Sequence, residues 1–158
     1  MMKNNRKTER TISMINDGTV IDHLDPTTVF EIVSLLNLDD CHDQITIGIN
    51  MKSNKIGRKG MIKIENHYLS KKDVDKISLF SPHATISLIK DYEIKEKFQV
   101  EIPKCIENVL KCNNPNCITN IEGERTSFSL YREEPLELRC KFCERHLLKK
   151  DLEVFKED

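Results

Sequence analysis

The chain has 158 residues, of which 38% are hydrophobic and 32% are charged, and its formal net charge is −1. This composition suits one medium-sized or two small domains, and the balanced charge argues against a nucleic-acid-binding surface. No apolar run approaches the roughly 18 residues that a membrane-spanning helix needs, so no membrane partner is expected. Residues 1–10 are basic without an apolar stretch, so we expect a flexible arm and a reducing, cytoplasmic setting.

Residues 12–97 predict alternating strands and helices. An extended pattern over residues 11–17 stops at Gly18 and resumes in residues 19–24. Asp25 followed by Pro26 is typical of a helix start, because a side-chain oxygen caps the first turn and proline has no N–H to leave unpaired. The residues that follow at helical spacing predict one apolar face: Val29, Ile32, Val33 and Leu36.

Further strands and a second helix are expected along the chain. Residues 44–51 alternate in polarity, which predicts a half-buried strand with one apolar side made of Ile45, Ile47, Ile49 and Met51. Residues 61–66 predict another strand. Ser70 and Asp73 have the spacing of a capping box at the start of a helix, and residues 84–89 and 92–94 are again extended. This order predicts an α+β, ferredoxin-like (βαββαβ) domain over residues 11–103.

Residues 104–158 differ in kind from the part before Pro103. Residues 126–131 and 136–140 are short β-like runs, and large apolar side chains are too few to stabilise about 55 residues without help. Four of the six cysteines are paired as C-x4-C and C-x2-C, with 22 residues between the pairs: Cys112, Cys117, Cys140 and Cys143. Four thiolates at this spacing are typical of a closed, structural Zn²⁺ site. We therefore expect a small β-rich, zinc-ribbon-like domain that holds one zinc ion.

The residues around this motif leave several interpretations open. His146 could replace one ligand, although four cysteines already complete the shell, and Cys41 and Cys105 are interpreted as ordinary reduced thiols. Zinc ribbons contact nucleic acids or proteins. The 10 Lys and Arg against 11 Asp and Glu of residues 104–158 favour a protein partner. Phe142 is either an exposed interface anchor or part of a small core.

Five segments resemble the regulatory chains of aspartate carbamoyltransferase: "GTVIDH" (18–23), "QITIGIN" (44–50), "GRKGMIKIEN" (57–66), "ENVLKCNNPNCI" (107–118) and "CKFCE" (140–144). The resemblance runs from about residue 11 to residue 146 with nearly constant spacing. It implies a non-catalytic regulatory subunit whose first domain binds nucleoside triphosphates, with CTP or UTP inhibitory and ATP activating. It also implies homodimers of regulatory chains, and a zinc domain that docks onto the catalytic chain and so controls pyrimidine biosynthesis.

The same resemblance implies roles for individual residues of the first domain. Lys97 and His23 would meet phosphate oxygens, and Lys63 would meet the ribose and base. Asp22 would orient the sugar end or a metal ion, and Lys59 would lie near the phosphates. The base pocket would be lined by Ile15, Tyr92 and Ile94. Without the resemblance, such lysines and aspartates would be interpreted as a solvated face, and the histidine as an ordinary structural one.

Candidates for contact with the catalytic chain lie beside the cysteines, although simple exposure would also explain them: Asn116, Lys141, Phe142, Glu144 and Arg145. The chain departs from the family pattern at Ser13, Ser87 and Phe142, and has one residue fewer between the cysteine pairs. A stand-alone nucleotide sensor or a zinc-ribbon nucleic-acid-binding protein stays open as the alternative. An independent enzyme is disfavoured, because the sequence offers no open metal site and no glycine-rich phosphate loop.

Overall fold

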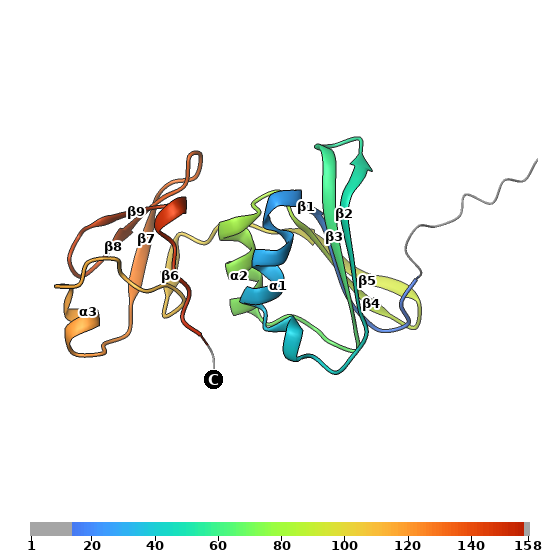
Figure 1. Cartoon of the computed structure of the whole chain (residues 1–158), viewed down its shortest axis with the longest axis horizontal. Helices are drawn as coiled ribbons and strands as arrows, with labels where there is room; N and C mark the ends of the chain where they lie inside the picture. The colour runs from blue at the N-terminus through green and yellow to red at the C-terminus, as the bar shows by residue number, and fades with distance from the viewer. Residues whose placement is uncertain (1–13, 157–158) are drawn as a thin grey trace, which may run out of the picture.

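The computed structural model describes residues 14–156, which form two β-sheets with helices beside the first (Figure 1). The first, sheet A, is antiparallel with strand order β2-β3-β1-β4-β5. Its strands are β1 (Gly18–Leu24), β2 (Ile45–Ser53), β3 (Gly57–Glu65), β4 (Thr85–Lys90) and β5 (Glu93–Gln99). The prediction of an α+β, ferredoxin-like domain is confirmed, and β5 adds one strand beyond the βαββαβ pattern.

The helices of this part begin at the predicted signals. The side chain of Asp25 accepts a hydrogen bond from the backbone N–H of Thr27, ahead of the 3-10 turn η1 (Pro26–Thr28) and helix α1 (Val29–Leu35). Helix α2 (Lys71–Phe80) begins with a complete capping box between Ser70 and Asp73. A second 3-10 turn, η2 (Leu38–Asp40), follows α1. These starts are set by local side-chain hydrogen bonds, which is why the sequence alone indicates them.

Two details of sheet A differ from the expectation. Of the extended pattern predicted over residues 11–17, residues 14–17 form no strand, while residues 1–13, with the expected arm and Ser13, lie outside the described residues. Gly18 begins β1 with a φ of 139°, and a Cβ there would lie 2.1 Å from the backbone oxygen of Ile64. Glycine is needed because β3 approaches closely. The register between β2 and β3 also shifts between Gly48 and Met51, with Asn50 at a φ of 58°. This bulge interrupts the alternation, so Met51 does not continue the apolar side of β2.

One face of sheet A is covered and the other is open. Figure 1 shows α1 and α2 lying between sheet A and the C-terminal part of the chain. The core on this side is fully buried and includes Ile21, Ile32, Ile62, Ile64 and Ile77. The opposite face, which we call the open face, points away from the C-terminal part.

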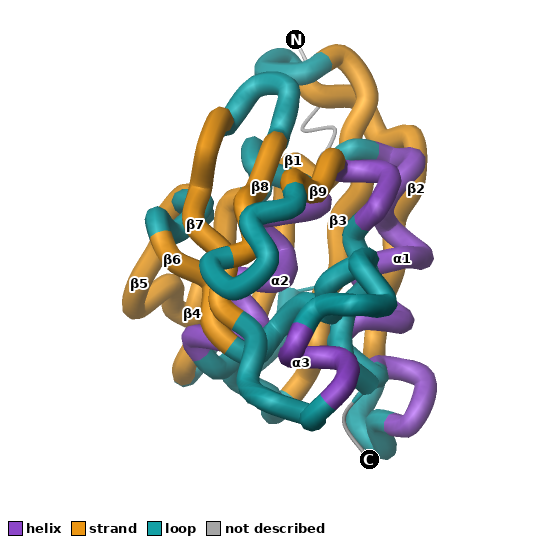
Figure 2. The backbone as a smooth tube through the Cα atoms, turned by 90° about the vertical axis from the view of Figure 1, so that its left-hand side faces the viewer, coloured by secondary structure: helices purple, strands orange, loops and turns teal. Residues whose placement is uncertain are grey.

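Residues 105–148 form the second sheet, sheet B, with strand order β6-β7-β8-β9. Its strands are β6 (Cys105–Glu107), β7 (Ser127–Arg132), β8 (Glu137–Cys140) and β9 (His146–Leu148), with helix α3 (Ile118–Ile121) and the 3-10 turn η3 (Lys149–Asp151) beside them. Figure 2 shows sheet B in front of the helices of the first part. Its small core contains Ile106, Phe128, Leu138 and Leu147. None of the helices within residues 14–156 has the length and apolar character to cross a membrane.

Candidate functional site

The four predicted cysteines come together at one end of sheet B. Their sulfur atoms all lie within 4.8 Å of one another, and no other side chain within residues 14–156 belongs to the group. The Sγ atoms of Cys112 and Cys143 are 3.6 Å apart, and those of Cys117 and Cys140 are 3.9 Å apart. Sulfurs at about 2.3 Å from a tetrahedral zinc ion would be roughly 3.8 Å apart. The residues present therefore fit one structural zinc ion, as the sequence predicts.

Backbone N–H groups from the two tight turns support the cluster. The N–H of Asn114 donates to the sulfur of Cys112, and the N–H groups of Phe142 and Cys143 donate to that of Cys140. Burial raises the pKa of the Cys112 thiol to about 12 and also raises the pKa of Cys140. For Cys143, burial acts in the same direction, but hydrogen bonds led by the N–H of Arg145 lower the pKa to about 7. Zinc binding must therefore displace protons, and zinc affinity falls in acid.

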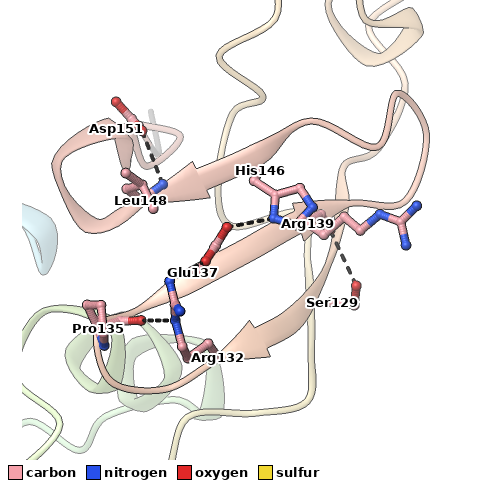
Figure 3. A network of polar contacts seen from close by, with 8 residues as sticks. All are labelled: Ser129, Arg132, Pro135, Glu137, Arg139, His146, Leu148 and Asp151. Carbon is pink, nitrogen blue, oxygen red and sulfur yellow. Dashed lines mark hydrogen bonds and ion pairs between the residues drawn. The ribbon is translucent and has the colours of Figure 1, made fainter.

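His146 is not a ligand of this centre. Its Nδ1 lies 2.8 Å from the Oε1 of Glu137 on the outer face of sheet B, where Glu137 also accepts from Arg132 at 2.7 Å (Figure 3). The ring of Tyr131 stands edge-on to His146, with 4.7 Å between ring centroids. These contacts hold the imidazole away from the cysteines, which leaves four thiolates as the metal ligands.

The five predicted interface residues are all exposed around the metal centre. Phe142 is 49% exposed at the tip of its turn, which excludes the interpretation as a core residue. Lys141 lies with its Nζ 3.2 Å from the sulfur of Cys105, and Glu144 pairs with Arg139 at 3.0 Å. Two residues missed by the sequence reasoning extend this surface: Ile118 and Ile121 are 39% and 65% exposed on α3, directly after a zinc ligand.

The predicted nucleotide-site lysines share the open face of sheet A. Lys63 is opposite Val20, Val20 is opposite Ser87, and Ser87 is opposite Lys97. Residues directly opposite in antiparallel strands place their side chains on the same face. A row therefore runs across β3, β1, β4 and β5. It has a lysine at each end and the small, buried side chains of Val20 and Ser87 between them.

A polar cluster lies at the end of β1 on the same face. Asp22 forms an ion pair with Lys59 at 2.9 Å, and both side chains are at most 20% exposed. The Nδ1 of His23 lies 3.1 Å from the hydroxyl of Thr85, and the His23 backbone N–H donates to Asp22 at 2.6 Å. Burial lowers the pKa of His23, Asp22 opposes this, and the charges of Lys59, Lys55 and Lys97 lower it further. Asp22, Lys59, His23 and Thr85 therefore form one connected polar cluster.

The predicted base-pocket residues lie at the other end of β1. Tyr92 and Ile94 are 60% and 57% exposed, and Ile94 is opposite Ile89 on the open face. The backbone N–H of Tyr92 donates to the carbonyl of Asn16 at 2.9 Å, which ties the β4–β5 turn to the segment before β1. Ile15 is only 3% exposed, so it packs in the interior beside Tyr92 and Ile94 rather than lining an open surface.

The strands carry several of these residues. Lys97 lies within β5, beyond residues 92–94 for which extended structure was predicted, and Asp22 and His23 lie within β1, as the extended pattern of residues 19–24 predicts. Thr85, which contacts His23, was missed as a site residue and could be found only from the pairing of β4 with β1. Lys55, whose charge acts on His23, was also missed and lies between β2 and β3.

Comparison with known proteins agrees with both parts of the chain. Residues 10–101 match the family model described as aspartate carbamoyltransferase regulatory chain, allosteric domain, and residues 104–153 match the metal binding domain of the same chain.

Among relatives carrying the name aspartate carbamoyltransferase regulatory chain, that of Thermoplasma acidophilum is 46% identical over 143 residues, which covers 89% of this chain and 95% of the relative. The Pyrococcus abyssi relative is 40% identical over 146 residues, or 91% and 96% of the two chains. The Methanococcus aeolicus relative is 46% identical over 156 residues, or 99% and 96%. The chain therefore belongs to the family of aspartate carbamoyltransferase regulatory chains, the non-catalytic subunits of that enzyme.

Proposed function

We propose that this chain binds nucleoside triphosphates on the open face of sheet A and thereby controls its catalytic partner in pyrimidine biosynthesis. CTP and UTP inhibit and ATP activates. The observation that carries the proposal is the gathering of His23, Lys59, Lys63 and Lys97 on one face, because a triphosphate needs several cations at once.

The phosphates lie against His23, Lys59 and Lys97, with Asp22 holding Lys59 or a metal ion. Lys63 meets the ribose and base. The base lies toward Tyr92 and Ile94, where backbone carbonyls, including that of Ile15, read its exocyclic amino group.

The chain has two proposed domains, an effector domain of residues 11–103 and a metal domain of residues 104–158. The effect of nucleotide binding passes from the effector domain through the metal domain to the catalytic chain. They touch where the Nζ of Lys149 donates to the carbonyl of Phe80 at the end of α2, at 3.0 Å. The metal domain docks onto the catalytic chain through the exposed surface beside the zinc ligands: Asn116, Lys141, Phe142, Glu144 and Arg145. Each effector shifts the catalytic equilibrium by about 1–3 kcal/mol of coupling free energy.

Regulatory chains pair as homodimers through their effector domains. The edge strand β2 supports this, because within residues 14–156 it is hydrogen-bonded to β3 on one side only, and Ile47 on it is 39% exposed. Nucleic acid is not a partner, because the formal charge is −1 and four thiolates around a divalent zinc ion add further negative charge to the metal domain.

An aspartate saturation curve of the matching catalytic trimer tests the proposal. Adding the zinc-loaded chain should change the curve from hyperbolic to sigmoidal, and CTP and ATP should move its midpoint in opposite directions. The isolated trimer with the same nucleotides is the control. A curve that stays hyperbolic and insensitive to nucleotides after the chain has bound would contradict the proposed function.

Nucleotide binding is expected to be accompanied by uptake of a fraction of a proton, at most one, at His23. In the free chain, burial holds the pKa of His23 below 6.5, helped by the neighbouring lysine charges. A phosphate oxygen beside the imidazole favours the charged form and raises this pKa. The affinity for the nucleotide should therefore rise as the pH falls from the pKa of His23 in the complex to its pKa in the free chain.

Calorimetry near pH 7 in buffers of different ionisation enthalpy measures the uptake. The variant His23→Gln should lose it, which separates the imidazole from protonation of the triphosphate itself. An uptake that is the same in both proteins would rule out His23 as the acceptor.

A further inference from the structure

A cavity of about 510 Å³ lies at the end of sheet A where β4 and β5 meet, and it contains none of the predicted nucleotide-site residues. It is lined by the apolar side chains of Tyr68 and Leu88, by Ile89, whose side chain is on the open face, and by four polar or charged residues: Lys90, Lys95, Asp17 and Asn66. This volume is within the range of about 300–1,000 Å³ that is usual for small-molecule sites. We call it the rear cavity.

Strand register places the rear cavity behind the open face. Ser87 faces the proposed nucleotide site, so Leu88, the next residue of β4, faces the opposite side. Leu88 is opposite Thr19, whose side chain is fully buried and donates to the carbonyl of His67 at 2.7 Å. The segment from β3 to α2 therefore crosses this side of the sheet, ahead of Lys71 where α2 begins.

The walls of the rear cavity are fixed by hydrogen bonds. The hydroxyl of Tyr68 donates to the carbonyl of Ile89 at 2.8 Å, which holds the ring across the end of β4. The carboxylate of Asp17 accepts from the backbone N–H of Asp91 at 3.2 Å. Asp91 and Tyr92 both have left-handed backbone conformations, with φ of 52° and 63°, as in a tight hairpin turn. The cavity is thus preformed rather than created by a ligand.

The charged and polar groups around the rear cavity indicate what kind of ligand it would bind. Lys95 pairs with Glu93 at 3.0 Å, but both side chains are more than half exposed, and such pairs contribute little stability. Lys95 can therefore turn toward a ligand, together with Lys90. On the other side, the carboxylate of Asp17 and the side-chain carbonyl of Asn66 are groups able to accept hydrogen bonds from a ligand.

We propose that the rear cavity binds a small planar anion whose apolar body lies against Tyr68 and Leu88. Its acidic group meets Lys90 and Lys95, and an N–H or O–H on the body donates to Asp17 or Asn66. This site is separate from the proposed nucleotide site and does not require it.

The probe 8-anilinonaphthalene-1-sulfonate has this chemistry: a planar apolar body, one sulfonate and one N–H. An NMR titration of the zinc-loaded full chain should give saturable binding, with the largest amide shifts at Tyr68, Leu88, Lys90 and Lys95. The double variant K90E/K95E should weaken binding about tenfold or more. Both lysines are exposed, so the fold should persist, and the unperturbed amide spectrum checks that it does.

Two control proteins separate this site from others. The variant K150E/K156E has the same change in net charge at exposed positions of the metal domain and should bind the probe normally. Lys97→Glu, which alters the proposed nucleotide site, should also bind it normally. Equal weakening in K150E/K156E and K90E/K95E would overturn the proposal, as would shifts centred on Tyr92, Ile94 and Lys97 or on sheet B.

Discussion

Removing the zinc ion should unfold the metal domain while sheet A keeps its structure. The core of sheet B is small, and three of the four metal ligands are buried within it. Structural zinc contributes about 10–16 kcal/mol in zinc-finger peptides, which exceeds the stability of most whole domains. Titration with a chelator, followed by amide NMR, should show loss of the dispersed signals of residues 105–154 and retention of those of residues 18–99.

A matched pair of variants tests the same point without a chelator. Cys117→Ser removes a ligand whose side chain is 1% exposed and whose sulfur accepts from Thr119 at 3.1 Å. It should abolish stoichiometric zinc and docking onto the catalytic chain. Cys41→Ser changes a cysteine outside the cluster and should retain both. A zinc-free chain in which sheet B persists and still docks would show that the metal is dispensable.

Replacing Lys97 by Glu should weaken nucleotide binding by roughly 100-fold or more. A hydrogen bond to a charged group contributes about 1.5–3 kcal/mol, and the new carboxylate would also repel the phosphates, so we expect a loss of about 3 kcal/mol. Because Lys97 lies on the open face, opposite Ser87, the core beneath β5 should be unaffected. Calorimetric titrations with ATP and with CTP measure the change.

Lys95→Glu is the matched control for Lys97→Glu, since it makes the same charge change two residues earlier in β5. Lys95 borders the rear cavity and pairs with Glu93, so nucleotide affinity should change by less than about threefold, as expected for a screened surface charge. Equal losses in the two variants would mean that only the overall charge of β5 matters and that Lys97 makes no direct contact.

Local signals explain what the sequence could predict. The starts of α1 and α2 follow from Asp25 with Pro26 and from Ser70 with Asp73, because each cap is made by residues within one helical turn. The metal centre could also be predicted from the sequence. Each cysteine pair lies on one tight turn, and only the approach of the two turns depends on the fold.

Strand pairing explains what the sequence could not predict. The role of Gly18 depends on the close approach of β3, and the position of Thr85 beside His23 depends on the pairing of β4 with β1. Extended structure was predicted only for residues 92–94, because the polar residues that follow hide the part of β5 that contains Lys97. The exposure of Ile121 depends on how α3 packs, which the pattern of its four residues does not reveal.

The row from Lys63 to Lys97 crosses three strand spacings, or about 14 Å. A ligand between them contacts both lysines where its own length, together with the reach of the two side chains, spans this distance. In the proposed binding mode Lys63 meets the ribose and base and Lys97 meets the phosphates, so each added phosphate extends the ligand toward Lys97. In this proposed binding mode, affinity for a nucleotide rises with its number of phosphates, so regulation would follow the phosphorylation state of the nucleotide pool and not only its total size.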